Sequence, residues 1–149
     1  MIDLIELIYE AAFVPERWKL VLQEASVLSH AASAQVFFFS ENAPPRGATL
    51  ENLRPLFDKF IAGDMWKFST GTQKMCSLQP ASFVRVDDFL TREEIERDPA
   101  RVMLREVGIG AMVCSSIAMP TGELATFVAE KWIRDGDFAR EEIDRLDAL

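Results

Sequence analysis

The chain has 149 residues, 49% of them hydrophobic, which suits one globular domain with a single packed core. Its formal net charge of −8 argues against a surface that grips a nucleic-acid backbone, because such binding requires clustered lysine and arginine. Two cysteines are too few for a disulfide framework, and neither a signal peptide nor a long apolar span is present, so we expect a cytoplasmic protein without a membrane partner.

Residues 1–32 predict two amphipathic helices. Ile2, Ile5 and Ile8 recur at helical spacing in a short first helix, which ends before Pro15 because proline disfavours helical geometry in the preceding residue. A second helix begins at Pro15 and carries one apolar stripe, which we expect to pack on a sheet. The stripe consists of Trp18, Val21, Leu22, Ala25 and Leu28.

The next segment, "SAQVFFFSE" at 33–41, predicts a strand. Its run of Val36 and three phenylalanines leaves no polar side, which indicates a strand covered on both faces. We expect "NAPPRG" to form a turn, residues 47–50 a short second strand, and residues 53–61 a third helix. The apolar positions of that helix are Leu53, Leu56, Phe57, Phe60 and Ile61.

Residues 63–90 show no sustained period and predict a long loop of the kind that forms lids or binding segments, although a short helix could lie within it. Regular structure resumes at Thr91, which forms a capping box with Glu94. Asp98 is expected to cap a further helix that has Pro99 at its first position and ends at Gly108.

Two strands at 111–119 and 124–132 flank "PTGE", a tight turn between antiparallel partners. Gly136 and Asp137 then predict a turn and the N-cap of a closing helix with Ile143, Leu146 and Leu149 on one side. No glycine, proline or basic run ends this helix, so we expect it to continue into an effector domain outside the 149 residues.

These elements predict an α+β sandwich that forms a single sensory or regulatory domain over residues 1–149. Residues 1–32 form its N-terminal helices, and residues 33–135 form the sheet core with inserted helices. Residues 136–149 begin a C-terminal connecting helix.

Signatures of catalysis and metal binding are weak. The only histidine, His30, lies at the end of the second helix without a ligand at metal-binding spacing, which favours a capping or surface role. Ser115 and Ser116 lie in a predicted strand without a G-x-S-x-G elbow, and Asp87 and Asp88 are typical of a turn. We therefore predict no catalytic residue, no metal site and no cofactor.

Soft and aromatic side chains are the stronger functional candidates. They could converge between the irregular segment and the sheet to line an apolar small-molecule cavity, bordered in particular by Trp66, Met112, Cys114 and Phe127. The full set of predicted ligand-binding residues is Trp66, Phe68, Met75, Met103, Met112, Cys114 and Phe127. The alternative is that these residues are ordinary core.

Several segments resemble one family in the same order along the chain. They are "LIELIYEAAFVPERWKLVLQEASVLSHAASAQVFFF", "FLTREEIERDPARVMLREVGIG", "MPTGE" and "DGDFAREEIDRLDAL". They are similar to the N-terminal sensory region of bacterial LuxR-type helix-turn-helix transcriptional regulators. The resemblance implies a PAS/GAF-like antiparallel sheet with packed N-terminal and C-terminal helices, and a closing helix that leads to a DNA-binding domain.

The wider family includes acyl-homoserine-lactone receptors with a pattern of Trp, Tyr and Asp in the pocket. Trp66 and Asp98 match it loosely, but the only tyrosine, Tyr9, lies on the first helix, so the sequence does not support that ligand class.

We therefore interpret the chain as a non-enzymatic, ligand-sensing input domain. Its partners would be an unknown apolar small molecule, a second copy of the chain, and DNA only through a missing C-terminal domain. We expect the first and closing helices to take part in a homodimer. Two alternatives remain: a structural homodimerisation module without ligand, and a small enzyme on the same scaffold.

Overall fold

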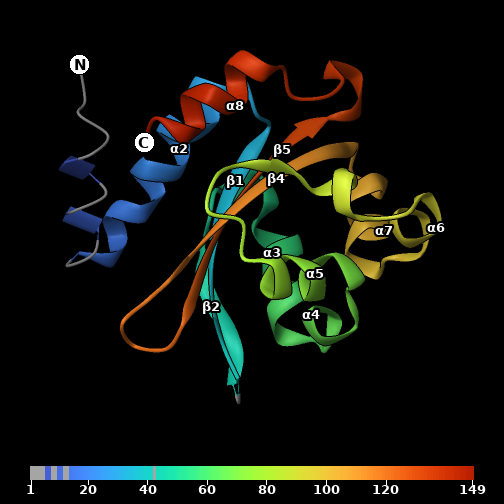
Figure 1. Cartoon of the computed structure of the whole chain (residues 1–149), viewed down its shortest axis with the longest axis horizontal. Helices are drawn as coiled ribbons and strands as arrows, with labels where there is room; N and C mark the ends of the chain where they lie inside the picture. The colour runs from blue at the N-terminus through green and yellow to red at the C-terminus, as the bar shows by residue number, and fades with distance from the viewer. Residues whose placement is uncertain (1–5, 8–9, 12–13, 42) are drawn as a thin grey trace.

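A computed structural model describes residues 6–7, 10–11, 14–41 and 43–149. Within them, one antiparallel sheet has the strand order β2-β1-β5-β4-β3, so that β5 is its central strand. The strands are β1 (Ser33–Ser40), β2 (Ala43–Thr49), β3 (Val84–Arg85), β4 (Ile109–Ala118) and β5 (Leu124–Trp132). Helices lie on both faces of this sheet, which confirms the predicted α+β fold (Figure 1).

The first face of the sheet is covered by helices from the two ends of the chain, α2 (Trp18–Ser29) and α8 (Arg140–Asp147) (Figure 1). Leu22 of the predicted stripe is buried against Val36 of β1 and Ala129 of β5, which confirms that α2 packs on the sheet. α2 follows a 3-10 turn, η1 (Pro15–Arg17). Residues 6–7 and 10–11 are helical, whereas Ile2, Ile5, Ile8 and Tyr9 lie outside the described residues.

The closing helix α8 differs from the prediction at its start. It begins at Arg140 after the N-cap Ala139, and the Glu142 carboxylate accepts a hydrogen bond from the Ala139 backbone N–H at 2.7 Å. Asp137 is therefore not the N-cap, and its carboxylate accepts from the backbone N–H of Phe138 instead.

The apolar side of α8 is part of the core of one subunit. Ile143 and Leu146, which the sequence pattern assigns to a subunit contact, are 1% and 2% exposed. They pack with Leu22 and Val36, so they are not available to a second copy of the chain. Of the three predicted apolar residues, Leu149, which lies beyond the helix, keeps substantial exposed surface.

The second face of the sheet carries a group of shorter helices (Figure 1). They are α3 (Arg54–Ala62), α4 (Met65–Phe68), α5 (Thr70–Leu78), α6 (Arg92–Arg97) and α7 (Pro99–Glu106), with 3-10 turns η2 (Glu51–Leu53) and η3 (Val86–Phe89). The capping box of Thr91 with Glu94 and the Asp98 N-cap are both present, as predicted. A last 3-10 turn, η4 (Ile133–Asp135), follows β5.

The predicted long loop at 63–90 is wrong, because α4, α5, β3 and η3 occupy most of it. α5 has the sequence "TGTQKMCSL", whose threonines and glycine have weak helix propensity. Ser69 starts this helix, since its hydroxyl accepts a hydrogen bond from the Thr72 N–H at 3.1 Å. A hydrogen bond from the Gly71 N–H to the distant Asp98 carboxylate then holds α5 in place, which a local pattern cannot indicate.

The predicted turn "NAPPRG" is wrong in the same way, since β2 runs over 43–49. β2 is one of the two edge strands of the sheet, where proline is tolerated because one side needs no ladder hydrogen bonds. Pro44 and Pro45 also lie at a register shift, between the pairs Ser40↔Ala43 and Phe38↔Arg46. The β4–β5 hairpin matches its prediction, with Gly122 at a φ of +89° in the turn.

Across the described ranges, no helix is both long and apolar enough to cross a bilayer.

Candidate functional site

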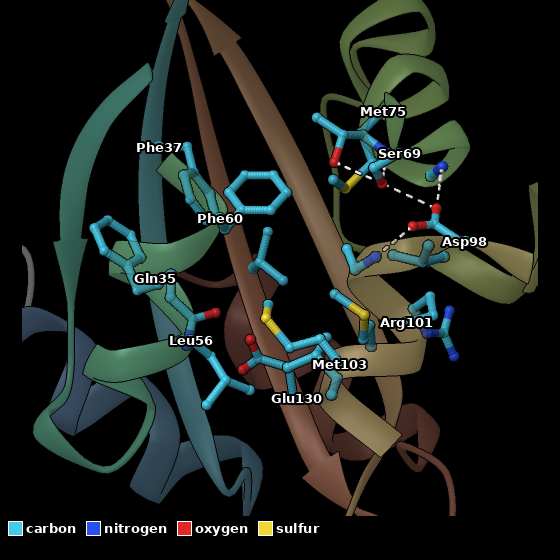
Figure 2. Close-up of a pocket in the computed structure, with 18 of the residues that line it drawn as sticks. Gln35, Phe37, Leu56, Phe60, Ser69, Met75, Asp98, Arg101, Met103 and Glu130 are labelled. Carbon is cyan, nitrogen blue, oxygen red and sulfur yellow. Dashed lines mark hydrogen bonds between the residues drawn. The ribbon is translucent and has the colours of Figure 1, made fainter. Parts of the chain in front are cut away.

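An interior cavity of about 70 Å³ lies between the second face of the sheet and helices α3, α5 and α7. In Figure 2, Gln35 and Phe37 of the sheet lie on the same side of this pocket as Leu56 and Phe60 of α3, and Met75 of α5 and Arg101 of α7 lie on the other side. Alternation along the strands decides which sheet residues reach it. Gln35 and Phe37 of β1, Val128 and Glu130 of β5, and Met112 of β4 line it.

Aromatic rings form one wall of the pocket. The Phe37 ring lies 5.1 Å from the ring of Phe57 and 5.3 Å from the ring of Phe60, measured between centroids. All three are buried, and the two α3 residues lie one helical turn apart on the face that points to the sheet. This wall is rigid and apolar.

Three methionines, Met75 of α5, Met103 of α7 and Met112 of β4, line the same pocket. Methionine is unbranched and has three rotatable bonds, so these side chains can repack around occupants of different shape. The pocket therefore combines a rigid aromatic wall with an adaptable one.

A hydrogen-bond network at one end of the pocket joins the starts of α5 and α7 (Figure 2). One oxygen of the buried Asp98 carboxylate accepts from the Ser69 hydroxyl at 2.9 Å and from the Gly71 N–H at 2.7 Å. Its other oxygen accepts from the Ala100 N–H at 2.9 Å. Both Asp98 oxygens are thus used inside the protein, and this group holds the two helices together.

Arg101 is a second charged residue on the wall that is already paired. Its guanidinium donates to the Asp87 carboxylate at 2.6 Å and to the Gly110 carbonyl oxygen at 3.0 Å. The sequence assigned Asp87 to a turn, and the structure adds that it neutralises this buried cation.

Among the described polar side chains of the pocket, Glu130 differs from Asp98 and Arg101 because one of its oxygens lacks a hydrogen-bond partner. It is 2% exposed, and its Oε2 atom has no hydrogen-bond partner. Burial raises the pKa of the Glu130 carboxyl well above its ordinary value, and hydrogen bonding by Gln35 and by its own backbone only partly opposes this. The acid therefore favours its neutral, protonated form.

The seven predicted ligand-binding residues do not all lie together. Met75, Met103 and Met112 line the cavity. Cys114 shares a strand face with Met112, but it is fully buried in the core beside the cavity. Trp66 borders a separate open groove with Pro44, and Phe68 is 69% exposed.

Phe127 lies on the opposite face of the sheet, where its ring is 5.9 Å from that of Trp18. The expectation of one cavity bordered by Trp66, Met112, Cys114 and Phe127 is therefore corrected, because odd-numbered residues of β5 point toward α2 and α8. The pocket instead includes residues outside the predicted set. They are mainly Gln35, Phe37, Phe57, Phe60, Val128 and Glu130. The sequence does indicate Gln35 and Glu130 as candidate site residues, since each is a polar residue inside an apolar strand.

Both cysteines are poor nucleophiles in this environment. Burial raises the pKa of the Cys114 thiol to about 12, with a smaller contribution from Cys76, and burial raises the pKa of Cys76 to about 11. Both thiols stay protonated near neutral pH, and for Cys114 the structure agrees with the alternative that it is ordinary core.

A second, larger groove of about 440 Å³ lies on the α2/α8 face. Phe127 and Ile117 line it from the sheet, and Leu146 and Leu149 line it from the end of the chain. Ile117 is 55% exposed, so this groove presents apolar surface to the outside.

Solved structures with the same fold include sensory domains of regulators. The LBD domain of VqsR from Pseudomonas aeruginosa superposes with a TM-score of 0.73 at 15% identity, over 98% of this chain and 86% of that one. The N-acylhomoserine lactone dependent LuxR family transcription factor CepR2 from Burkholderia cenocepacia superposes with a TM-score of 0.61 at 10% identity, over 97% of this chain and 87% of that one. A GAF domain/HD domain protein from Geobacter sulfurreducens superposes with a TM-score of 0.56 at 14% identity, over 99% of this chain and 89% of that one.

No protein-family model matches the sequence, and a comparison with curated proteins finds no match. The structural likeness therefore concerns the fold. At that level it confirms the resemblance to the sensory domains of LuxR-type regulators.

Proposed function

We propose that this chain is the ligand-sensing input domain of a LuxR-type transcriptional regulator, and that its ligand is a small, mainly apolar molecule. The observation that carries the proposal is the interior apolar pocket between the sheet and helices α3, α5 and α7. Its walls combine rigid aromatic rings with adaptable methionines. The shared fold with the LBD domain of VqsR supports the same assignment.

The size of the cavity indicates how such a ligand acts. At about 70 Å³ the cavity is smaller than the roughly 150 Å³ engineered cavity that admits benzene. A larger ligand therefore binds a conformation in which the methionines repack and the short helices move outward. The ligand shifts the population toward that conformation by its difference in affinity for the two.

Strand β5 connects the pocket to the closing helix. Glu130 points into the pocket, and the next residue, Lys131, points to the other face of the sheet. There the Lys131 ammonium lies 2.7 Å from the Glu142 carboxylate of α8, and His30 at the end of α2 contacts the same carboxylate at 2.7 Å. A displacement of β5 at the pocket thus reaches α8, which we propose leads to a DNA-binding domain.

Filling the cavity is expected to remove ligand binding without unfolding the domain. Ala100 of α7 lines the cavity, so Ala100→Leu occupies the space with added methyl groups. In a thermal-shift screen of apolar metabolites, a ligand at a hundred times its Kd stabilises the wild-type protein by about 2.7 kcal/mol. The Ala100→Leu variant should lose most of that gain.

The matched control is Ala62→Leu, the same chemical change at an exposed position of α3. It should respond to the ligand as the wild type does. Full stabilisation of Ala100→Leu by the same ligand would place the binding site elsewhere.

A homodimer is the second part of the proposal, because LuxR-type regulators are expected to read paired DNA half-sites. The groove beside the end of α8 supplies exposed apolar surface for it at Ile117 and Leu149, so Ile117→Glu should convert a dimer into a monomer. Ile133→Glu changes a residue of equal exposure outside that groove and should leave the dimer intact. Light scattering at several concentrations measures the mass, and a constant monomer for the wild type would refute the dimer.

A further inference from the structure

The polar groups around the pocket differ in whether the protein already satisfies them. Asp98 accepts three hydrogen bonds, and Arg101 is paired with Asp87 and a carbonyl oxygen. Ser69 donates to Asp98, and Thr72 donates to Ser69 at 3.0 Å. Of the described polar side chains on this wall, Glu130 is the one with an unpaired atom.

The two residues that pair with Glu130 across the sheet do not supply a partner for its Oε2 atom. Its cross-strand partner on β1 is Ser33, whose hydroxyl donates to the Asn52 side chain at 3.0 Å. Its cross-strand partner on β4 is Met112, which has no strong hydrogen-bonding group. Figure 2 shows the Glu130 carboxyl beside the Leu56 and Met103 side chains, both of which also line the cavity.

A buried acid with one unpaired oxygen lowers stability, because the folded protein has removed Oε2 from water without giving it a partner, although Gln35 and the Glu130 backbone hydrogen-bond the carboxyl group. The neutral acid that burial favours has one O–H donor and one carbonyl acceptor. Such a group recognises an uncharged polar group inside an apolar site.

We propose that Glu130 is the polar recognition group of the pocket, and that it hydrogen-bonds an uncharged oxygen of the ligand, such as a carbonyl or hydroxyl group. The proposal rests on the ligand-sensing function proposed above and specifies its ligand class. The apolar part of the ligand lies against Phe37, Phe60 and the three methionines, and the oxygen meets Glu130 between β5 and α7.

Other ligand classes fit less well. A carboxylate would lose its hydration in an apolar site where Arg101, the lining cation among the described residues, is already paired. An ammonium group would require Glu130 to ionise in surroundings that favour its neutral form. A pure hydrocarbon would leave the Glu130 oxygen unpaired.

The test uses four-carbon probes that carry different polar groups: 2-butanone, butylamine and butanoate. Binding is followed through the methyl NMR signals of Met75, Met103 and Met112, with Met119 at the exposed end of the β4–β5 hairpin as an internal control. We expect 2-butanone to shift the three pocket signals with a Kd at least about tenfold lower than the two charged probes.

Two variants separate recognition from packing. Glu130→Leu should weaken 2-butanone binding about tenfold, because the donor is lost. Glu130→Gln should keep the wild-type Kd within about threefold, because the carboxamide N–H also donates to a carbonyl. If Glu130→Leu does not fold, the role of Glu130 in recognition is tested by the probe preference of the wild type and by the Kd of Glu130→Gln.

Equal binding of the charged probes, or unchanged 2-butanone binding by Glu130→Leu, would overturn the role of Glu130 and leave the ligand-sensing function standing. If no probe shifts any pocket methionine signal, the pocket does not admit small molecules. That result would contradict both this inference and the proposed function.

Discussion

Replacing Asp98 by alanine is expected to lower the free energy of unfolding by about 3–5 kcal/mol, the largest effect of any single substitution considered. The change leaves the Gly71 and Ala100 N–H groups and the Ser69 hydroxyl without their acceptor in a buried site. It also removes the N-cap of α7, which contributes about 1 kcal/mol by itself. Urea unfolding followed by circular dichroism measures the loss.

Two further variants identify the cause. Asp98→Asn keeps an acceptor oxygen and should cost clearly less than Asp98→Ala. Asp88→Ala changes an exposed aspartate in the nearby turn η3 and should be within about 0.5 kcal/mol of the wild type. Equal stability of Asp98→Ala and Asp88→Ala would show that the network does not hold α5 and α7 together.

Replacing Glu142 by glutamine is expected to destabilise the domain by about 3 kcal/mol at neutral pH. Lys131 and Glu142 are both buried, and their side chains lie 2.7 Å apart, so the variant leaves a buried lysine without its counter-ion. Burial raises the pKa of the Glu142 carboxyl, but hydrogen bonds from Lys131, the Ala139 N–H and His30 outweigh burial and lower it to about 2.

The sign of the pH dependence follows from that depressed pKa. Glu142 stabilises the fold fully above about pH 4.5, its unfolded pKa, and this contribution is lost as the pH falls toward 2. The gap in unfolding free energy between the wild type and Glu142→Gln should therefore narrow from pH 5 to pH 2. A gap that stays constant over this pH range would contradict the ion pair. As a control, Glu141→Gln at the exposed neighbouring position should leave the unfolding free energy close to that of the wild type at either pH.

Local patterns predicted the elements that the chain specifies locally. The apolar stripe of α2, the capping box at Thr91 and the proline-initiated helix after Asp98 depend on residues close in sequence, and all three are present. The antiparallel β4–β5 hairpin follows from its turn and its two flanking strands.

The elements that the sequence missed depend on distant contacts. α5 has weak intrinsic propensity, and its start is held by Asp98 from a segment 27 residues away. β2 contains two prolines and forms because its position at the sheet edge and the register shift accommodate them. A short window of sequence reveals neither the contact of α5 with Asp98 nor the position of β2 at the sheet edge.

The site was predicted only in part, for a reason that β5 illustrates. "LATFVAEKW" is apolar at odd and even positions, because helices cover both faces of this strand. Alternation therefore does not reveal whether the odd or the even residues face the pocket. The sequence pattern indicates Phe127, whereas Val128 and Glu130 line the pocket. The three methionines that line the cavity belong to the predicted set, because soft side chains are typical of adaptable pockets.

Amide hydrogen exchange with and without a stabilising ligand tests the central claim most directly, because it reports on the pocket and on the closing helix in one measurement. We predict that the ligand changes protection in α3, α5 and α7 around the pocket, and also in β5 and α8, which are joined by Lys131 and Glu142. The edge strand β2 should change little. Changes that stop at the pocket, with α8 unaffected, would contradict the account of this domain as a sensor that signals through its closing helix.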